Sequence, residues 1–400
     1  MTVLELAEYG PPLSVALDDV TGRALARSRL LDIAPDPEVA GNWRVRAGNK
    51  VGVAAVHMPD GSSVILRIAP KVPIARLLFL LGFSRSPKGW RSEHVQVDSD
   101  EDLLPAFARL FAMEADEALR QGLLKGYRTT DETALVVRGR IRLGDQLSRR
   151  YGQLIPLEIT HDEYTTDIAE NQLLRAACEA LLRLPGRLPP DVRGVLLRLR
   201  VRLAEASPLT RGGRLPVWRP SRLNARYQVA LRLAELVLHG CSVEHRSGDV
   251  TVQGFLFDMA KVFEDFVTTA LREEFAHGDG YCVLQATHYL DDRNAIRLIP
   301  DFVRYDRAGT PLAVADAKYK AQKPEGFPDA DLYQMLAYCT ALNLAEGHLV
   351  YAKGNAPHGA HRVRHAGITI HQHALDLELP PPALLGQVGD IADHLAAAVR

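Results

Sequence analysis

Two aspartates and a lysine on neighbouring predicted strands are the residues whose types and spacing could support chemistry. Side chains alternate along a strand, so Asp301 falls on an otherwise apolar face, and Asp316 and Lys318 share an apolar face of the next strand. A carboxylate is costly to bury alone in such surroundings, which implies a partner or a cation. Mg²⁺ prefers oxygen ligands and is commonly held by one or two carboxylates with waters and a phosphate. The pattern therefore predicts a site for a hard divalent cation.

Polar side chains on two predicted helices could reach this site. After the helix cap Asp258, Glu264 lies at the edge of the apolar stripe rather than on the solvent face, so it can face the sheet. Its alternative role is an ion pair with Lys261, three residues earlier. Gln334 and Tyr338 are neighbours four residues apart on the second helix, although Tyr338 could equally be a packing residue.

These residues lie in a segment whose predicted elements alternate between helix and strand. The predicted elements are, in order, a helix over 258–276, strands over 281–289, 296–305 and 312–319, a helix over 330–345 and a strand over 348–352. The turn-forming stretch 306–311 separates two of the strands and makes them antiparallel neighbours. The resulting order is α-β-β-β-α-β.

The rest of the chain differs in pattern from this segment. The 400 residues are enough for two or three domains. Residues 1–92 are predicted to be β-rich with one helix, and residues 93–250 to be mainly helical with a strand pair near 134–160. With residues 251–400 as the third domain, the expected fold class is α/β, more specifically a multidomain α+β protein.

Charge is distributed unevenly along the sequence. The formal net charge of −1 would argue against a protein that binds polyanions. However, residues 120–230 contain 20 basic and 11 acidic residues, whereas the remainder contains 28 basic and 38 acidic residues. The near-neutral total therefore conceals a basic middle segment, which we expect to supply contacts to phosphates.

Three arginines and a histidine in the middle segment are weaker candidates for a functional role. Arg138, Arg140 and Arg142 alternate and so line one face of a predicted strand. That face is either a solvated strand edge or a contact to phosphate or a partner. His161 and the adjacent Asp162 have no further metal ligands at useful spacing, and we interpret them as structural.

Taken together, the motifs of the candidate site resemble the PD-(D/E)xK nuclease superfamily. The resemblance rests on Pro300-Asp301, Asp316-Ala317-Lys318, the upstream Glu264 and the downstream Gln334-x-x-x-Tyr338. Longer stretches at 259–267, 316–320 and 331–338 are similar to the McrC family, the nuclease subunits of McrBC modification-dependent (type IV) restriction systems. Shorter matches at 68–71, 138–140, 162–167 and 224–227 extend the resemblance over most of residues 1–352.

The resemblance implies a metal-dependent endodeoxyribonuclease with a PD-(D/E)xK, restriction-endonuclease-like domain at its C-terminal end. Asp301 and Asp316 would ligate Mg²⁺, helped by the Ala317 carbonyl and supported by Glu264, and Mn²⁺ could substitute. Lys318 would orient and polarise the attacking water. Two further side chains would line the site near the DNA: Gln334 and Tyr338.

The resemblance also implies partners. McrC-like proteins are paired with McrB, a hexameric AAA+ GTPase, and their N-terminal region docks into the pore of the ring and stimulates GTP hydrolysis. We therefore expect a McrB-like partner bound through residues 1–92, and double-stranded, methylated DNA (for example with 5-methylcytosine) as the substrate. The motif G-x-x-x-x-G-K-[ST] is absent, so this chain should not hydrolyse a nucleotide itself.

Two rival interpretations keep the fold but change the function. The chain could be a non-catalytic adaptor that only binds and activates the motor, although none of the expected ligands is missing from the sequence. It could also be a stand-alone nuclease of the RecB type, which shares the Gln-x-x-x-Tyr motif. Relatives of that type with an iron–sulphur cluster need four clustered cysteines, whereas the four here are scattered.

The sequence predicts a cytoplasmic protein that does not cross a membrane. The apolar run 77–83 is far shorter than the about 20 residues of a membrane span. The first residues are acidic and lack the basic start of a signal peptide. The cysteine spacing contains no C-x-x-C pair, which favours reduced thiols.

Overall fold

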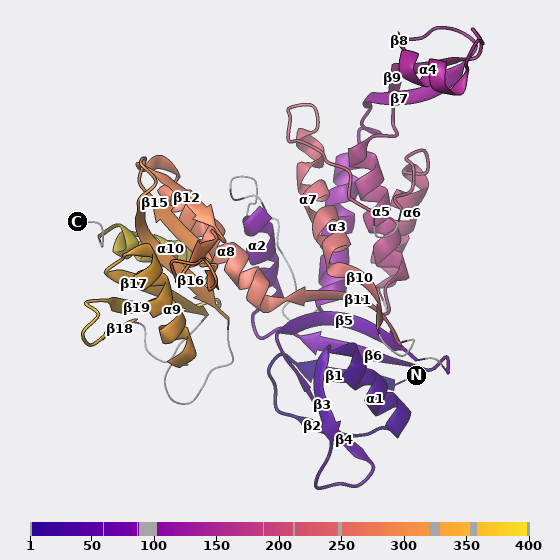
Figure 1. The fold of residues 1–400 in the computed structure, drawn as a ribbon. Helices are drawn as coiled ribbons and strands as arrows, with labels where there is room; N and C mark the ends of the chain where they lie inside the picture. The colour runs from indigo at the N-terminus through magenta and orange to yellow at the C-terminus, as the bar shows by residue number, and fades with distance from the viewer. Residues whose placement is uncertain are drawn as a thin grey trace. The chain divides into compact units, whose positions relative to one another are not determined.

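The computed structural model of the chain divides into two compact units, whose elements are drawn in Figure 1. One unit comprises Met1–Ala106 and Ser242–Arg400, and the other comprises Phe107–Cys241. The described residues are 2–58, 60–85, 87, 102–186, 188–210, 213–246, 250–319, 329–352 and 358–397, with only the backbone described at 242–246, 250 and 358. The expected mixed α/β class is confirmed, because both units combine helices and sheets.

A five-stranded sheet forms one part of the first unit. Its spatial order is β1 (Thr2–Ala7), β6 (Ser63–Ala69), β5 (Lys50–His57), β11 (Val250–Asp258) and β10 (Cys241–Arg246). β1 is parallel to β6, whereas β5 is antiparallel to both β6 and β11. The last two strands of the sheet come from far along the chain, so the N-terminal sheet is completed by residues that directly precede the predicted catalytic segment.

One helix and a small second sheet cover this five-stranded sheet. The helix α1 (Asp19–Ser28) begins after Asp18, whose carboxylate accepts a hydrogen bond from the Thr21 backbone N–H at 2.8 Å. The small sheet consists of β2 (Leu13–Ala16), β4 (Asn42–Ala47) and β3 (Leu31–Pro35). Apolar side chains of these elements form one buried core with β5 and β6.

The six-stranded sheet of the first unit carries the predicted site. Its spatial order is β12 (Tyr281–Leu284), β15 (Phe302–Tyr305), β16 (Pro311–Lys318), β17 (Glu346–Ala352), β19 (Thr369–Leu375) and β18 (His358–Arg362). β15 is antiparallel to β12 and β16, whereas β17 is parallel to β16 and β19. The helix α9 (Asp329–Leu342) packs on one face, and α8 (Met259–Glu274) and α10 (Pro381–Ala397) lie on the other (Figure 1).

Two of the predicted strands are interrupted. The helices α8 and α9 and the strands β16 and β17 confirm the prediction, but the strands expected over 281–289 and 296–305 are not continuous. After β12 the backbone turns at Gln285, which adopts φ +51°. The residues that follow form β13 (His288–Tyr289) and β14 (Arg297–Leu298), which pair only with each other. The segment is therefore a hairpin inserted between two strands of the sheet.

The structure also contains elements that the sequence analysis did not predict. β19, β18 and α10 follow residue 357 and extend the six-stranded sheet by two strands and a helix. β19 contains the uninterrupted polar run His371-Gln372-His373 and β18 has the sequence His-Gly-Ala-His-Arg, so neither shows the regular alternation of apolar and polar residues that identifies a strand.

A very apolar helix, α2 (Ile74–Arg85), packs on α8 through aromatic rings. The ring centroids of Phe79 and Phe83 lie 5.9 and 5.5 Å from that of Phe266. The apolar run expected from the sequence is thus used for packing. No helix in the described part of the chain combines the length and apolar character needed to cross a membrane.

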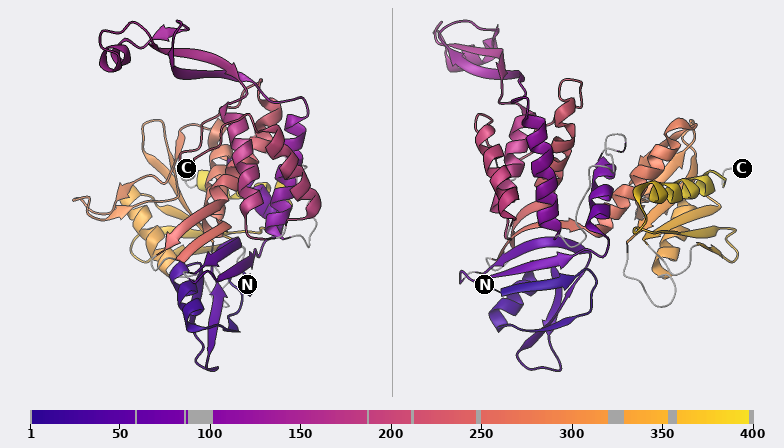
Figure 2. Two further views of the ribbon diagram at one scale, coloured as in Figure 1. Left: turned by 90° about the vertical axis from the view of Figure 1, so that its right-hand side faces the viewer. Right: turned by 180° about the vertical axis from the view of Figure 1, so that it is seen from behind.

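The second unit is a group of helices that carries a long hairpin. Its main helices are α3 (Leu103–Leu119, in which the division between the units falls), α5 (Ala169–Arg183), α6 (Pro190–Arg202) and α7 (Gln228–Gly240), as predicted. The hairpin strands β7 (Gly126–Ala134) and β9 (Leu157–Thr165) lie on either side of the region 134–160 near which the strand pair was expected, and Figure 2 shows them extending from one end of the helices. Between them lie the short β8 (Arg140–Ile141) and α4 (Leu143–Arg149).

Gly347 is required by the close approach of α9 to the sheet. A Cβ atom there would lie 2.5 Å from Cys339 Sγ and 2.6 Å from Met335 Sδ. We expect Gly347→Ala to lower the free energy of unfolding by about 1–3 kcal/mol, because the core would be overpacked. The control Gly386→Ala in α10, where a Cβ meets nothing within 4 Å, should be neutral or slightly stabilising. Urea unfolding measures both, and equal midpoints would contradict this packing.

Candidate functional site

Asp301 and Asp316 face each other across two antiparallel strands. Phe302 pairs with Ala315 in the sheet, and continuing this register by one residue places Asp301 opposite Asp316. The Ala317 backbone N–H donates a hydrogen bond to Asp301 Oδ2 at 2.9 Å. Asp316 is only 3% exposed. The two carboxylates are therefore close neighbours in surroundings with little water.

This proximity changes the proton affinity of Asp301. Burial, and after it the negative charge of Asp316, raise the pKa of the Asp301 carboxyl to about 7. The hydrogen bond from Ala317 acts in the opposite direction. The pair therefore resists carrying two negative charges, and a cation bound between the two carboxylates would relieve the repulsion.

Lys318 links the carboxylate pair to helix α9. Its ammonium group forms an ion pair with the Asp316 carboxylate and donates a hydrogen bond to Gln334 Oε1 at 2.9 Å. Asp316 Oδ2 has no other hydrogen-bond partner among the described residues. The ion pair holds the lysine at the acidic site, where it partly offsets the negative charge.

Gln334 and Tyr338 continue this network towards the other strand. Gln334 Nε2 donates to the Tyr338 hydroxyl at 2.7 Å, and that hydroxyl donates to the Ile299 carbonyl at 3.2 Å. Burial and the charges of Asp316 and Asp301 raise the pKa of Tyr338, so its phenol stays a neutral donor. Tyr338 is both a packing residue of the core and a member of the network.

Glu264 lies beside the carboxylate pair but has partners of its own. Its Oε1 atom accepts hydrogen bonds from Lys261 Nζ at 2.8 Å and from Gln285 Nε2 at 2.6 Å. The expected ion pair with Lys261 is thus present. The charge of Glu264 also contributes to raising the pKa of Asp301, which places it near enough to influence the site.

Gln285 is a site residue that the sequence analysis missed. Besides its contact with Glu264, its backbone N–H donates to the Asp301 carbonyl at 3.1 Å. Gln285 therefore fixes the backbone just before β15 and connects it to α8. In the sequence, Gln285 is marked only as a polar residue directly after the apolar strand Tyr281–Leu284. That feature is too common to identify a site residue before the fold is known.

Another buried carboxyl, that of Glu8 after β1, contacts the residue that follows β16. Glu8 is 1% exposed and accepts a hydrogen bond from the Lys71 backbone N–H at 3.0 Å. The hydroxyl of Tyr319, which directly follows Lys318, also hydrogen-bonds to Glu8 and so lowers its pKa, although burial raises it more. The N-terminal sheet therefore contacts the strand that carries the candidate lysine.

The donor set fits a Mg²⁺ ion that takes part of its coordination from outside the protein. Two carboxylates are present at Asp301 and Asp316, and their mutual repulsion favours a cation. Within the described ranges, no three His, Cys, Asp or Glu side chains gather closely enough to form a metal centre by themselves. Ala317 follows Asp316 on β16, and waters or a substrate phosphate would have to complete the shell.

The other sequence candidates lie elsewhere or outside the described residues. The strand predicted to carry Arg138, Arg140 and Arg142 on one face is wrong, because β8 spans Arg140–Ile141 alone and Arg142 lies at the start of α4, where it forms ion pairs with Glu158 and Asp145. Asp162 accepts a hydrogen bond from the Thr129 hydroxyl at 2.7 Å across the hairpin, as the structural interpretation of this pair expects. Lys320 and the expected domain boundary at 92/93 lie outside the described residues.

Fold and site together define a multidomain mixed α/β protein in which two acidic side chains and a lysine meet at the ends of adjacent strands. A family model described as "McrBC 5-methylcytosine restriction system component" matches residues 45–352. Because this match spans more than half of the chain, the protein belongs to that family. The resemblance to McrC seen in the sequence is thereby confirmed at the level of the family.

One solved structure shows the same fold. A Thermococcus gammatolerans half-complex, from a tetradecameric assembly of McrB AAA+ hexamers with bound McrC, matches with a TM-score of 0.61. That match has 19% identity and covers 98% of this chain and 100% of the other. The T. gammatolerans McrBC complex solved by cryo-EM matches with 20% identity and a TM-score of 0.40, over 70% of this chain and 90% of the other. No curated protein matches the sequence.

The raised pKa of Asp301 predicts how stability depends on pH in the presence of a chelator. Because the pKa is about 7 in the folded protein and 3.8 ordinarily, protonation favours the folded state. This contribution is complete below pH about 4 and is lost as pH rises through about 7. We expect the urea midpoint to fall over this window, and Asp301→Asn to remove that fall.

The control for this prediction is Asp306→Asn, on the turn after the same strand. The Thr310 backbone N–H lowers the pKa of Asp306, so this group stabilises the fold above its ordinary pKa and loses that contribution in acid. Asp306→Asn should therefore still show the fall of the urea midpoint between pH 4 and 7. A wild-type midpoint that is constant over this window would contradict the close approach of the two carboxylates.

Proposed function

We propose that this protein is a McrC-like, Mg²⁺-dependent DNA endonuclease subunit with a PD-(D/E)xK domain. It would cleave phosphodiester bonds in modified DNA, such as DNA with 5-methylcytosine, when assembled with a McrB-like AAA+ GTPase whose activity it stimulates. The observation that carries this proposal is the pair of facing carboxylates, the partly buried Asp301 and the buried Asp316, with Lys318 bound to the second. Family membership supports the restriction context.

Mg²⁺, or Mn²⁺ in its place, would supply two things: a lowered pKa of bound water and neutralisation of charge on the phosphate. Asp301 and Asp316 would hold the ion, helped by the Ala317 carbonyl, with Glu264 supporting it from the side. Asp301 must be ionised for this role, and its raised pKa means that it gives up its proton near neutral pH. Cation binding and loss of that proton are therefore coupled.

The remaining residues would position the water and the DNA. Lys318 carries the positive charge nearest to the carboxylates and would orient the attacking water. Gln334 holds the lysine ammonium through one hydrogen bond, so it restricts where that charge lies. Tyr338 fixes Gln334 and the Ile299 backbone, which precedes Asp301 by two residues. The three side chains act as a rigid support for the site.

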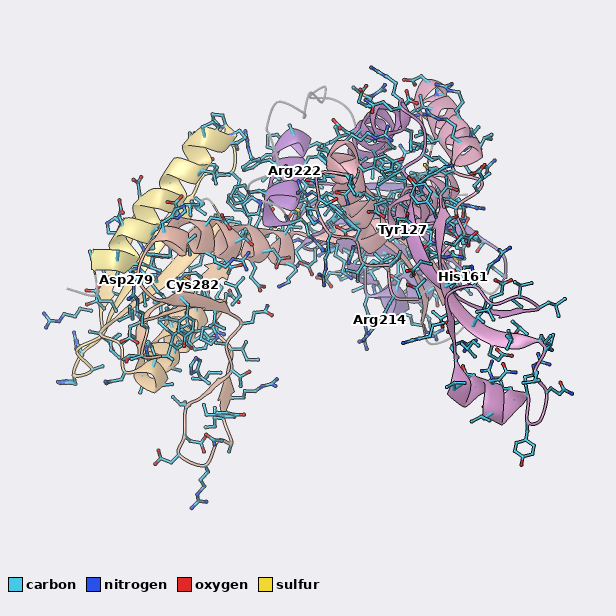
Figure 3. All side chains as sticks on the ribbon, turned by 90° about the horizontal axis from the view of Figure 1, so that it is seen from above. Tyr127, His161, Arg214, Arg222, Asp279 and Cys282 are labelled. Atoms are coloured by element: carbon cyan, nitrogen blue, oxygen red, sulfur yellow. The ribbon has the colours of Figure 1, made fainter. Side chains whose placement is uncertain are left out.

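A McrB-like AAA+ hexamer is the proposed partner, as in the McrB–McrC assembly that matches this fold. Docking through residues 1–92 stays a prediction. The second unit offers a further candidate surface on the segment between β7 and β9. Large apolar side chains are exposed there, as they are on surfaces that a partner covers. They include Leu135, Val136, Leu143, Leu147, Tyr151 and Leu154; Tyr127 and His161, labelled in Figure 3, mark the strands that carry this segment.

We also propose that the protein acts in the cytoplasm, where it can meet DNA. All four cysteines are free thiols, as the sequence predicts: Cys178, Cys241, Cys282 and Cys339. Contact between the basic segment 120–230 and DNA phosphates belongs to the same proposal.

A non-catalytic adaptor is the second candidate function. The observation that favours it is the engagement of Glu264 by Lys261 and Gln285, which leaves two carboxylates rather than three for a cation. An adaptor would bind the AAA+ partner and raise its GTPase activity without cleaving DNA. Cleavage by the isolated chain in Mg²⁺ would instead indicate a stand-alone nuclease.

Replacement of the central carboxylate tests catalysis directly. Asp316→Ala should lower Mg²⁺-dependent cleavage of methylated plasmid by more than about 100-fold, because the ligand and the anchor of Lys318 are both lost. Binding to the AAA+ partner and stimulation of its GTPase should be retained. Asp279→Ala, an exposed aspartate remote from the site, is the matched control and should cleave normally. Equal cleavage by both variants would exclude this site.

Replacement of exposed apolar residues tests partner docking through the second unit. Tyr151 and Leu154 are 89% and 85% exposed, so replacing both with serine should leave the fold intact. We expect affinity for the AAA+ partner to fall at least about tenfold, since apolar side chains near the centre of an interface dominate its energy. Val201→Ser on α6, where valine is 70% exposed, is the control. Unchanged binding of the double variant would place the contact elsewhere.

A further inference from the structure

The hairpin inserted before Asp301 has a defined shape. β13 and β14 pair antiparallel, with His288 opposite Leu298 and Tyr289 opposite Arg297. The loop is closed by Asp291, whose Oδ1 atom accepts hydrogen bonds from the backbone N–H groups of Ala295 at 2.9 Å and Ile296 at 2.7 Å. Figure 3 shows the hairpin extending away from the sheet beyond Cys282 of β12. It is an ordered projection rather than a loose connection.

The base of the hairpin is packed, whereas its outer part exposes apolar side chains. His288 stacks on Tyr305 and bonds to its hydroxyl at 2.8 Å, and Leu298 packs against the core beneath α9. Alternation places Leu290 and Ile296 on this same face but further out. They are 39% and 51% exposed, so no described residue covers them fully.

Two arginines give the projection a positive character. Arg293 at the tip and Arg297 on β14 are exposed and form no ion pair among the described residues. Asp291 is engaged in closing the loop, and Asp292 is the acidic residue exposed beside Arg293. Guanidinium groups without protein partners are available to bind phosphate oxygens.

The hairpin is fixed to the candidate catalytic residues at both of its ends. At the start, Gln285 donates its backbone N–H to the Asp301 carbonyl and its side chain to Glu264. At the end, the Ile299 carbonyl accepts the hydrogen bond of Tyr338. A duplex whose phosphate lies at the carboxylate pair would therefore have this projection beside it.

We propose that the hairpin 286–299 is a DNA-contacting element that enters the major groove next to the scissile phosphate. A two-stranded ribbon fits the width of that groove, where apolar side chains contact the methyl groups of pyrimidines. Arg293 and Arg297 contact the phosphates that border the groove, and Leu290 and Ile296 contact base edges. This inference rests on the proposed nuclease function for its ligand, double-stranded DNA.

The experiment measures equilibrium binding of a methylated duplex to the full chain, alone and with its AAA+ partner. The Asp316→Asn background prevents cleavage in Mg²⁺. The double variant Arg293→Ala, Arg297→Ala should bind about eightfold more weakly per arginine at 0.1 M salt. The slope of log K against log salt should fall by about 0.9 per arginine for the same reason. Leu290→Ser with Ile296→Ser should weaken binding severalfold without changing that slope.

Matched controls test whether the effect belongs to the hairpin. Arg307→Ala removes an arginine that is 82% exposed on the turn at the opposite end of β15, and it should not change affinity or slope. Met113→Ser replaces an apolar side chain that is 63% exposed on α3 and should be equally neutral.

The outcomes separate this inference from the proposed function. Wild-type affinity and slope in both hairpin variants would overturn it. A changed sedimentation coefficient or weaker partner binding, with DNA binding unchanged, would overturn it too, because the hairpin would then be a protein interface. If the chain with Asp316 intact does not cleave in Mg²⁺ but the hairpin variants lose affinity, the nuclease proposal fails and the DNA contact stands.

Discussion

The repulsion between Asp301 and Asp316 is the constraint on which the rest of the site depends. A buried and a partly buried carboxylate at facing positions resist being ionised together, and the pKa of Asp301 is raised for this reason as well as by burial. Two neighbouring groups partly offset this repulsion: the Ala317 backbone N–H donates a hydrogen bond to Asp301, and the Lys318 ammonium forms an ion pair with Asp316. Neither removes the excess negative charge. The Mg²⁺ ion that we propose for this site would relieve the repulsion, whereas apolar side chains in these positions would pack without that cost.

Two contacts join the elements of this site to the N-terminal sheet. Asp258, the cap of α8, accepts hydrogen bonds from the helix N-terminus and from Asn49 Nδ2 at 2.6 Å. Tyr319 contacts Glu8, which is buried. The helix that carries Glu264 and the strand that carries Lys318 are therefore both held by residues near the start of the chain. A change in that sheet would reach both elements through these direct contacts.

The sequence predicted the elements whose apolar residues recur at a helical or strand period, and the site residues that this period places on one face. Apolar periodicity identified α8, α9 and β16, and strand alternation brought Asp301, Asp316 and Lys318 together. It could not identify Gln285, since a lone polar residue after a strand has no periodic signal. It also could not find the Glu8–Tyr319 contact, which joins residues more than three hundred positions apart in the sequence. Pairings of this kind depend on tertiary packing that local patterns do not encode.

The interrupted strands are the most informative failure of the pattern. Residues 281–305 are apolar enough to be two long strands, yet the chain leaves the sheet at Gln285 and returns only at Phe302. Continuous strands would have buried Leu290 and Ile296 beneath a longer sheet. The chain instead keeps them partly exposed and closes the loop with Asp291. Local rules that fail in this way are expected where function competes with packing, and the failure here lies directly beside the paired carboxylates.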